Sequence, residues 1–252
     1  MEVKPIPGME HLPFAEVWFH AIDDDLWGEA SRLARELGKT GLEAWTTEET
    51  PEVVAYLAAR GYEEVRRYLR SELDVAAAPD PAPSALPIVT LAERPDLVPA
   101  LYEIAAQSYP DQPGRGETRM SDFDTWRSWG LDPHRPDAFF VVLDPQGAPA
   151  QGAPAQGAPG DDVLGYGFLE IEGDSGYHGF TAVARRARGR GVAGAIKRAQ
   201  IAWAKANGVR VLRTANEVRL EGMIALNERH GYRPQPAEIV LRGPLAPPAP
   251  LH

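Results

Sequence analysis

The amino-acid sequence predicts an α/β (α+β) fold, in which helices flank a mixed, mostly antiparallel sheet. Three observations support this prediction. Strand-like and helical segments succeed one another after residue 88, a strand enters a long helix through a glycine-rich turn, and another strand follows that helix. Strands joined through a helix pair in parallel, whereas short connections give antiparallel pairs. The sheet should therefore contain both kinds of pair.

The individual elements follow from residue type and spacing. Strands are expected where β-branched and aromatic residues gather, at 88–91, 139–143, 163–171, 177–183, 209–214 and 239–241. Helices are expected where apolar residues recur three and four positions apart, at 97–108, 121–130, about 190–207 and 221–230.

Proline-rich and repetitive segments divide the chain. Residues 77–87 predict an extended linker, because proline cannot donate to a sheet ladder and disfavours helix in the residue before it. Residues 146–160 repeat Gln-Gly-Ala-Pro-Ala and predict a low-complexity loop between two strands. We therefore expect a first domain at 1–76, a second at 88–243, and a flexible tail at 244–252.

An internal repeat relates the first domain to the second. At an offset of 170 positions, identical residues include Gly38 and Gly208, Gly61 and Gly231, and Tyr62 and Tyr232. Such positions lie at helix ends and in the core, so residues 1–76 are predicted to form a partial copy of the same architecture. This partial copy needs a neighbour to bury its sheet, either the second domain or another subunit in a homodimer.

Composition excludes several classes of function. The 252 residues include no cysteine, which excludes disulfides, thiolate metal sites and a cysteine nucleophile, and no metal is expected. A secretory signal pattern and an apolar run of about 18 residues are both missing, so we expect a cytoplasmic protein without membrane spans.

The distribution of charge predicts an anionic ligand. The net charge is −10, yet residues 184–233 contain 12 Lys and Arg against 3 Asp and Glu. Nucleic acid is disfavoured as that ligand, because the chain is acidic overall and no aromatic residues are interleaved with the arginines.

The segment from Val183 to Ala193 predicts where the anion binds. Gly189 and Gly191 stand between the strand and the long helix, and arginines surround them. The first turn of a helix has N–H groups without intrahelical partners and the positive end of the macrodipole. Glycine permits a close approach, and arginine grips phosphate oxygens. A diphosphate is the ligand implied; the alternative is a helix start with solvated arginines.

The corresponding segment of the first domain lacks this chemistry. Trp18-Phe19-His20-Ala21-Ile22 is followed by Asp23, Asp24 and Asp25, so it has no glycine and carries repelling carboxylates. The first copy should therefore not bind phosphate in this way.

The segment from Val183 to Ala193 resembles the acyl-CoA-binding motif of the GCN5-related N-acetyltransferase (GNAT) family, through Arg188, Gly191 and Ala193. Arg185 stands where the family commonly has proline. Residues 227–232 are similar to the end of the family's last helix and to the glycine–aromatic pair that follows it. The resemblance covers about 88–243. It implies acetyl-CoA as co-substrate. The pyrophosphate would lie on Arg188, Gly189, Arg190, Gly191, Val192 and Ala193, and the pantetheine arm on Thr181, Ala182, Val183 and Asn216.

Direct attack of an amine on the thioester needs a base and a group that assists the leaving thiolate. Glu170 is our candidate for the base, with Glu172, Asp174 and His178 as alternatives. Many family members have a tyrosine where this chain has Asn227, which can hydrogen-bond the thioester but cannot usefully donate a proton.

The sequence thus predicts an acetyl-CoA-dependent N-acetyltransferase that acts on the primary amine of a small molecule. A non-catalytic acyl-CoA-binding or regulatory module is the alternative, and the replacement at Asn227 is the reason to keep it.

Overall fold

The computed structural model describes residues 1–6, 10–112, 120–145 and 163–248. The chain divides into two compact units. The first comprises Met1–Arg70, Asn216–Ile224 and Pro234–His252, and the second comprises Ser71–Ala215 and Ala225–Arg233. These boundaries differ from the domains expected at 1–76 and 88–243, because residues after 233 pack with the N-terminal part of the chain.

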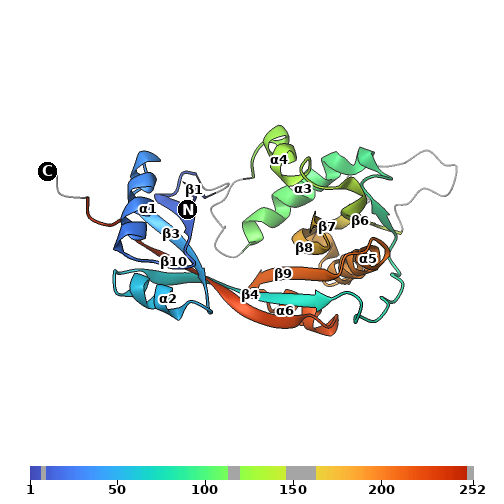
Figure 1. The fold of residues 1–252 in the computed structure, drawn as a ribbon. Helices are drawn as coiled ribbons and strands as arrows, with labels where there is room; N and C mark the ends of the chain where they lie inside the picture. Colours follow the sequence, from blue (N-terminus) through green and yellow to red (C-terminus); the bar gives the residue numbers. More distant parts are fainter. Residues whose placement is uncertain (7–9, 113–119, 146–162, 249–252) are drawn as a thin grey trace. The chain divides into compact units, whose positions relative to one another are not determined.

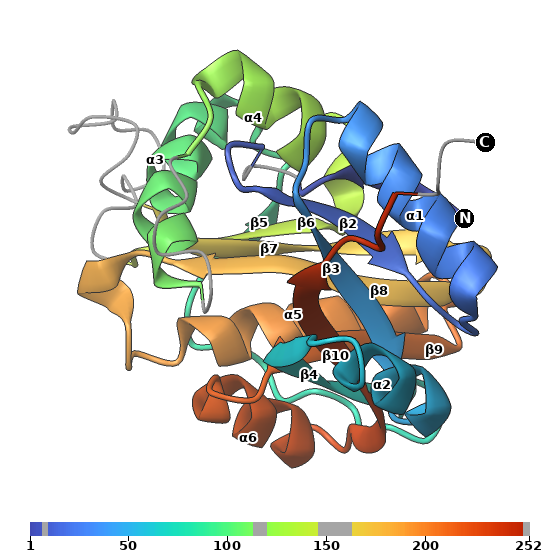
Figure 2. The ribbon, with the colours of Figure 1, turned by 90° about the vertical axis from the view of Figure 1, so that its left-hand side faces the viewer.

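The second unit has the mixed sheet that the sequence predicts. Successive strands β5 (Ile88–Thr90), β6 (Phe139–Leu143), β7 (Val163–Glu172) and β8 (Ser175–Val183) are antiparallel neighbours, whereas β8 pairs in parallel with β9 (Val211–Glu217). Figures 1 and 2 show α3 (Val98–Ser108) and α4 (Phe123–Gly130) on one face of this sheet and α5 (Val192–Ala206) on the other.

Apolar side chains fill both faces of this sheet. Trp126, Phe139 and Tyr166 belong to the larger cluster, which includes α3 and α4. Ile201 and Leu212 belong to a second cluster between α5 and the strands. Helix α5 lies very close to β7, since a Cβ atom added to Gly167 would lie 2.8 Å from Ile196. Glycine at that position therefore sets the approach of the helix that begins at the predicted anion site.

The first unit is assembled from both ends of the chain. Strands β1 (Val3–Pro5) and β2 (Phe14–Trp18) are antiparallel, and β2 is parallel to β3 (Gly41–Thr47). Strand β10 (Arg233–Pro244) pairs antiparallel with β3, from Glu238 opposite Thr47 to Pro244 opposite Gly41. The closing strand is thus much longer than the predicted 239–241. Helices α1 (Asp24–Glu36) and α2 (Pro51–Ala58) cover its apolar cluster.

The segments predicted as linker and tail are partly anchored. Residues 77–87 form neither helix nor strand, but the Lys205 ammonium lies 2.7 Å from the Asp80 carboxylate. After β10, Ala246 is buried and its N–H donates to the Ser31 hydroxyl at 2.8 Å. The expected flexible tail therefore does not begin at 244. The predicted loop at 146–160 lies outside the described residues.

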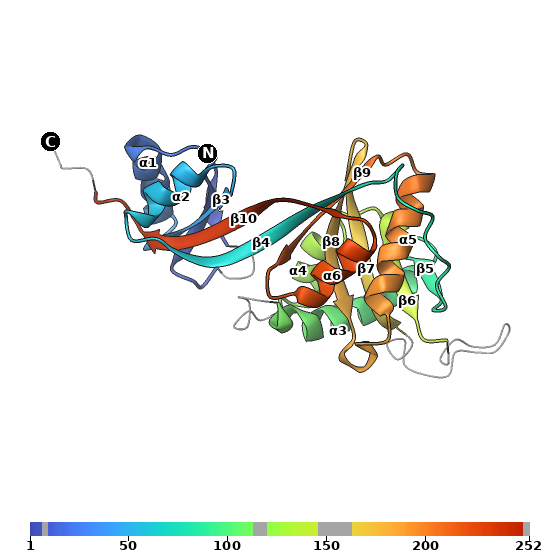
Figure 3. The ribbon, with the colours of Figure 1, turned by 90° about the horizontal axis from the view of Figure 1, so that it is seen from below.

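The repeat at an offset of 170 is visible in the elements themselves. Both bounds of β3 recur 170 positions later in β9, and both bounds of β4 (Glu63–Asp74) recur in β10, which lies beside β4 (Figure 3). The connecting glycines share a left-handed backbone, with φ of 71° and 75° at Gly38 and Gly208. These shared bounds and glycine conformations are consistent with the partial N-terminal copy predicted from the sequence.

The described helices are too short or too polar to cross a bilayer; the longest, α5, has 15 residues.

Candidate functional site

The turn between β8 and α5 exposes backbone donors at a helix start. A short 3₁₀ turn over Arg185–Ala187 precedes the helix, and Gly189 and Gly191 have φ of 75° and 79°. A Cβ atom added to either glycine would meet nothing within 4 Å, so the space beside them is open. Within the described residues, no side chain caps α5, and its first hydrogen bond runs from the Ala195 N–H to the Gly191 carbonyl. The N–H groups of Val192, Ala193 and Gly194, in the first turn of α5, are thus available to an anion.

Helix α1 of the first unit shows the opposite arrangement. Its N-cap residue is Asp23, whose carboxylate accepts from the Leu26 N–H at 2.8 Å, and Asp24 and Asp25 occupy the first turn. The helix start is already satisfied by the chain's own negative charge. That this copy does not bind phosphate in the same way stays a prediction.

Arginine side chains add positive charge around the uncapped turn. Arg188 and Arg185 both reach Asp111, with nitrogen–oxygen distances of 2.6 and 2.9 Å, and both remain largely exposed. Hydrogen bonds from Arg188 and then Arg185 hold the pKa of Asp111 below its usual value. Arg190 lies 3.7 Å from Asp144, and Arg186 donates to the Val163 carbonyl at 3.1 Å. The turn can therefore offer both backbone amides and guanidinium groups to a phosphate.

The pairing between strands β8 and β9 ends midway along β8, and we call this point the fork. Their parallel register runs only from Ser175 opposite Val211 to Tyr177 opposite Arg213, although β8 continues to Val183. On its other side β8 stays paired with β7, across a bulge between Gly167 and Leu169. Thr181, Ala182 and Val183 lie on the stretch beyond this fork, where β8 has no registered partner in β9. An extended, amide-rich ligand can bind to such a strand edge.

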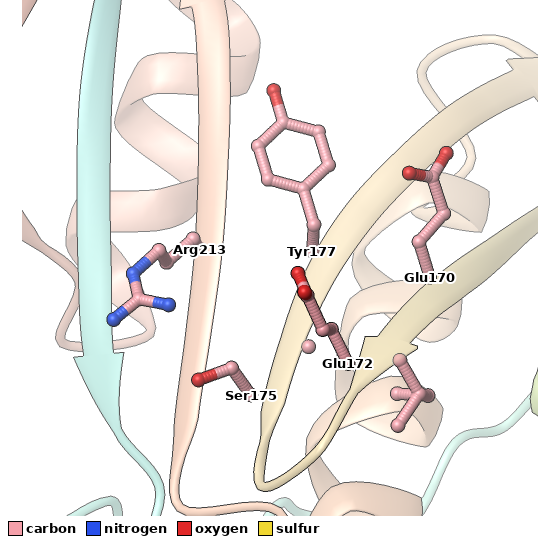
Figure 4. Close-up of a pocket in the computed structure, with 7 residues that line it drawn as sticks. Glu170, Glu172, Ser175, Tyr177 and Arg213 are labelled. Carbon is pink, nitrogen blue, oxygen red and sulfur yellow. The ribbon is translucent and has the colours of Figure 1, made fainter.

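A cavity of about 360 Å³ opens next to the fork. Figure 4 shows the Glu170 carboxylate and the Tyr177 hydroxyl extending in the same direction from β7 and β8, consistent with their pairing in the sheet. Glu172 and Ser175 also line the cavity. The Arg213 guanidinium turns away from Tyr177 to Glu72 of β4, at 2.9 Å. The cavity thus presents carboxylates to which a cationic amine would be attracted.

The other candidate bases lie in different surroundings. Asp174 is at the β7–β8 turn and pairs with Arg210 at 2.5 Å. His178 is buried on the α5 side of the sheet, where Nδ1 lies 2.8 Å from Gln200 and Nε2 contacts the Tyr232 hydroxyl. Burial and the nearby Lys197 charge, in that order, hold the pKa of His178 well below its usual value. Of the four candidates, Glu170 and Glu172 line the cavity.

Sequence reasoning did not single out His134, which stacks on Phe168 with ring centroids 4.0 Å apart. Burial lowers the pKa of His134, and the Glu170 charge opposes that shift. No local pattern marks a histidine in this loop. Lys197 and Gln200 were also missed, although two polar residues within the apolar stripe of a helix are a signal that could have drawn attention to them.

The remaining two predicted residues lie late in the chain. Asn227 is buried in α6 (Glu221–Arg229), and its carbonyl accepts from the N–H groups of His230 and Tyr232 at 2.9 and 3.2 Å. Asn216 lies in β9 and belongs to the first unit. Its expected contact with the pantetheine arm stays a prediction.

Comparisons with known proteins agree with this geometry. Residues 98–232 match the family model described as the acetyltransferase (GNAT) family. A GCN5-related N-acetyltransferase from Sphaerobacter thermophilus has a similar fold, with a TM-score of 0.72, 17% identity, and 99% of this chain and 78% of that one covered. A tandem GNAT protein from the clavulanic acid biosynthesis pathway has a TM-score of 0.61 and 21% identity, with 94% of this chain and 76% of that one covered. No curated protein sequence matches this chain.

Proposed function

The chain belongs to the acetyltransferase (GNAT) family, and from this premise we propose that it transfers an acetyl group from acetyl-CoA to the primary amine of a small molecule. The observation that carries the proposal is the uncapped start of α5, where open glycines and the Arg185–Arg188 pair form a cradle for a diphosphate. The N-terminal copy, capped by Asp23, takes no part in binding acetyl-CoA.

The proposed contacts with acetyl-CoA follow the order of the chain. Residues 188–193 hold the pyrophosphate through amide N–H groups and guanidinium groups. Thr181, Ala182 and Val183 bond the pantetheine arm along the strand edge beyond the fork. This arrangement brings the thioester to the end of the parallel pairing at Tyr177 and Arg213.

We place the acceptor amine in the cavity beside the fork. Glu170 takes the proton that the amine nitrogen loses as it bonds the carbonyl carbon, so attack occurs directly in a ternary complex. Glu172 contributes negative charge that favours a cationic acceptor. Asn227 hydrogen-bonds the thioester.

The alternative of a non-catalytic acyl-CoA-binding module rests on Asn227, which cannot supply a proton. Release of free CoA from acetyl-CoA in the presence of a panel of small amines supports the enzyme. Binding of acetyl-CoA without turnover of any amine favours the module.

Two glycines of one helix provide a matched test of the binding site. Gly191 and Gly208 lie at the two ends of α5, have φ of 79° and 75°, and are both open to solvent. Gly191→Glu places a carboxylate at the phosphate cradle, whereas Gly208→Glu imposes the same strain far from it. Acetyl-CoA should raise the melting temperature of the wild type and of Gly208→Glu, but not of folded Gly191→Glu. An equal rise in both variants would overturn the assignment.

A further inference from the structure

Lys197 is a buried lysine whose charge is not neutralised by a carboxylate. Its side chain lies within α5, the residue is 3% exposed, and the ammonium sits 4.9 Å from the centre of the Tyr232 ring. Among the described residues, no acidic group forms an ion pair with it. Burying an unpaired ammonium is costly, so its retention in a core position suggests a use for the charge.

The neighbours of Lys197 form a polar cluster next to the fork in the sheet. His178 is the first residue of β8 after the last parallel pair, and Tyr232 follows α6. Gln200 donates to the Phe168 carbonyl at 3.1 Å, so its oxygen accepts from His178 Nδ1–H. His178 Nε2 then accepts from the Tyr232 hydroxyl. The Tyr232 proton is thus held by His178, which leaves Lys197 as the group in this cluster with a proton to give.

Burial gives Lys197 a pKa suited to donating a proton. Burial lowers the pKa of Lys197 to about 7, and the same ammonium helps to lower the pKa of both His178 and His230. The Lys197 charge therefore disfavours protonation of both histidines, and Arg198 lies on the same helix. A free thiol has a pKa of about 8.5, so a proton moves downhill from such an ammonium to a thiolate. An ordinary lysine, with a pKa of about 10.4, would hold its proton too tightly.

We infer that the Lys197 ammonium supplies the proton taken up by the coenzyme A thiolate, a role that Asn227 cannot fill. The inference rests on the proposed function. As the amine nitrogen bonds the carbonyl carbon, the carbon–sulfur bond breaks and its electron pair leaves on sulfur. Lys197 gives that sulfur one proton and becomes neutral, while Glu170 receives one proton from the amine nitrogen. Exchange with water then restores both side chains.

The first test measures the titration of Lys197 in the wild-type protein. Lysine labelled with ¹³C at Cε should show one signal that titrates near pH 7 in the wild-type protein, assigned through its loss in Lys197→Met. Because this readout does not depend on turnover, it holds even without an identified acceptor. A Lys197 signal that titrates only above pH 9 would overturn the inference.

The second test separates proton donation from charge. In the wild type, kcat should fall as pH rises through about 7, because the donor must be protonated. Lys197→Met should lower kcat at pH 6.5 by about 10²-fold and abolish that fall, with acetyl-CoA affinity kept. Lys197→Arg keeps the charge but does not release its proton, so it should not restore kcat. Lys205→Met, on the same helix, is the control and should match the wild type.

Failure of the inference differs from failure of the proposed function. Suppose that the wild-type protein turns over amines. If Lys197→Met then keeps the kcat and the pH profile of the wild type, or if Lys197→Arg has them, only the role of Lys197 is overturned. A wild-type protein that neither binds acetyl-CoA nor releases CoA overturns the proposed function itself.

Discussion

Asp111 is a single residue that positions two arginines of the proposed phosphate site. Its carboxylate holds Arg185 and Arg188 beside the turn, and those two arginines keep its pKa low, so it stays ionised at neutral pH. A diphosphate brings more negative charge than one carboxylate and also reaches the backbone amides. In the proposed complex, the arginines are therefore in position before the diphosphate arrives, and the diphosphate takes the place of Asp111 beside them.

Two glutamates on one strand test the assignment of the base. Glu170 and Glu172 both line the cavity, but Glu170 lies opposite Tyr177, at the last parallel pair of the fork. Glu170→Gln should lower kcat by about 10²-fold, because the amine loses its proton acceptor. Glu172→Gln should mainly raise the KM of the acceptor. Steady-state kinetics with a reactive amine measure both, and a larger loss of kcat in Glu172→Gln would transfer the role to that residue.

Helices α1 and α5 demonstrate how the residues at a helix start decide its use. The Asp23 carboxylate satisfies the first turn of α1, whereas α5 starts at a glycine that contributes no side chain. Equivalent elements of the repeat have thus acquired opposite chemistry through a few residues.

Removal of the cap of α1 should therefore affect stability and not binding. Asp23→Ala leaves the Leu26 N–H without its acceptor and should lower the free energy of unfolding by about 1 kcal/mol. Asp25→Ala, in the same first turn, should cost only roughly 0.3 kcal/mol through the helix dipole. Urea denaturation compares the two variants. Weakened acetyl-CoA binding in Asp23→Ala would contradict the assignment of the site to α5.

The elements of residues 88–214 were predictable because their patterns are local. Clusters of β-branched and aromatic residues mark β6 to β8, and the glycine-rich turn marks the start of α5. Strand β4 and most of β10 were missed, since charged residues such as those at 63–72 hide the apolar alternation of a strand. The roles of Lys197 and His178 depend on contacts between distant segments, and local patterns do not contain that information.

At the scale of the whole molecule, residues before the linker complete the second unit. Leu73, near the end of β4, is buried in the cluster that contains Ile201, Leu212 and Tyr232, and the Val75 N–H donates to the Arg210 carbonyl at 2.9 Å. The segment expected to fold as a domain, 88–243, therefore lacks part of its own core.

A pair of leucines on β4 measures this contribution. Leu73 is 3% exposed and Leu69 is 37% exposed. Leu73→Ala should lower the free energy of unfolding by about 2–5 kcal/mol, because it leaves a cavity in the second unit. Leu69→Ala should change it by less than about 1 kcal/mol. Equal effects in chemical denaturation would show that β4 adds nothing particular to that core.

The pairing of β3 with β10 also sets the timing of folding during synthesis. Gly41–Thr47 leave the ribosome roughly 200 residues before their partners at 238–244, which at about 5–20 residues per second is a wait of about 10–40 s. Until then the N-terminal sheet has an open edge beside Leu42 and Ala44, exposed to nascent chains and chaperones. The N-terminal unit is thus completed only after residues 238–244 have been synthesised.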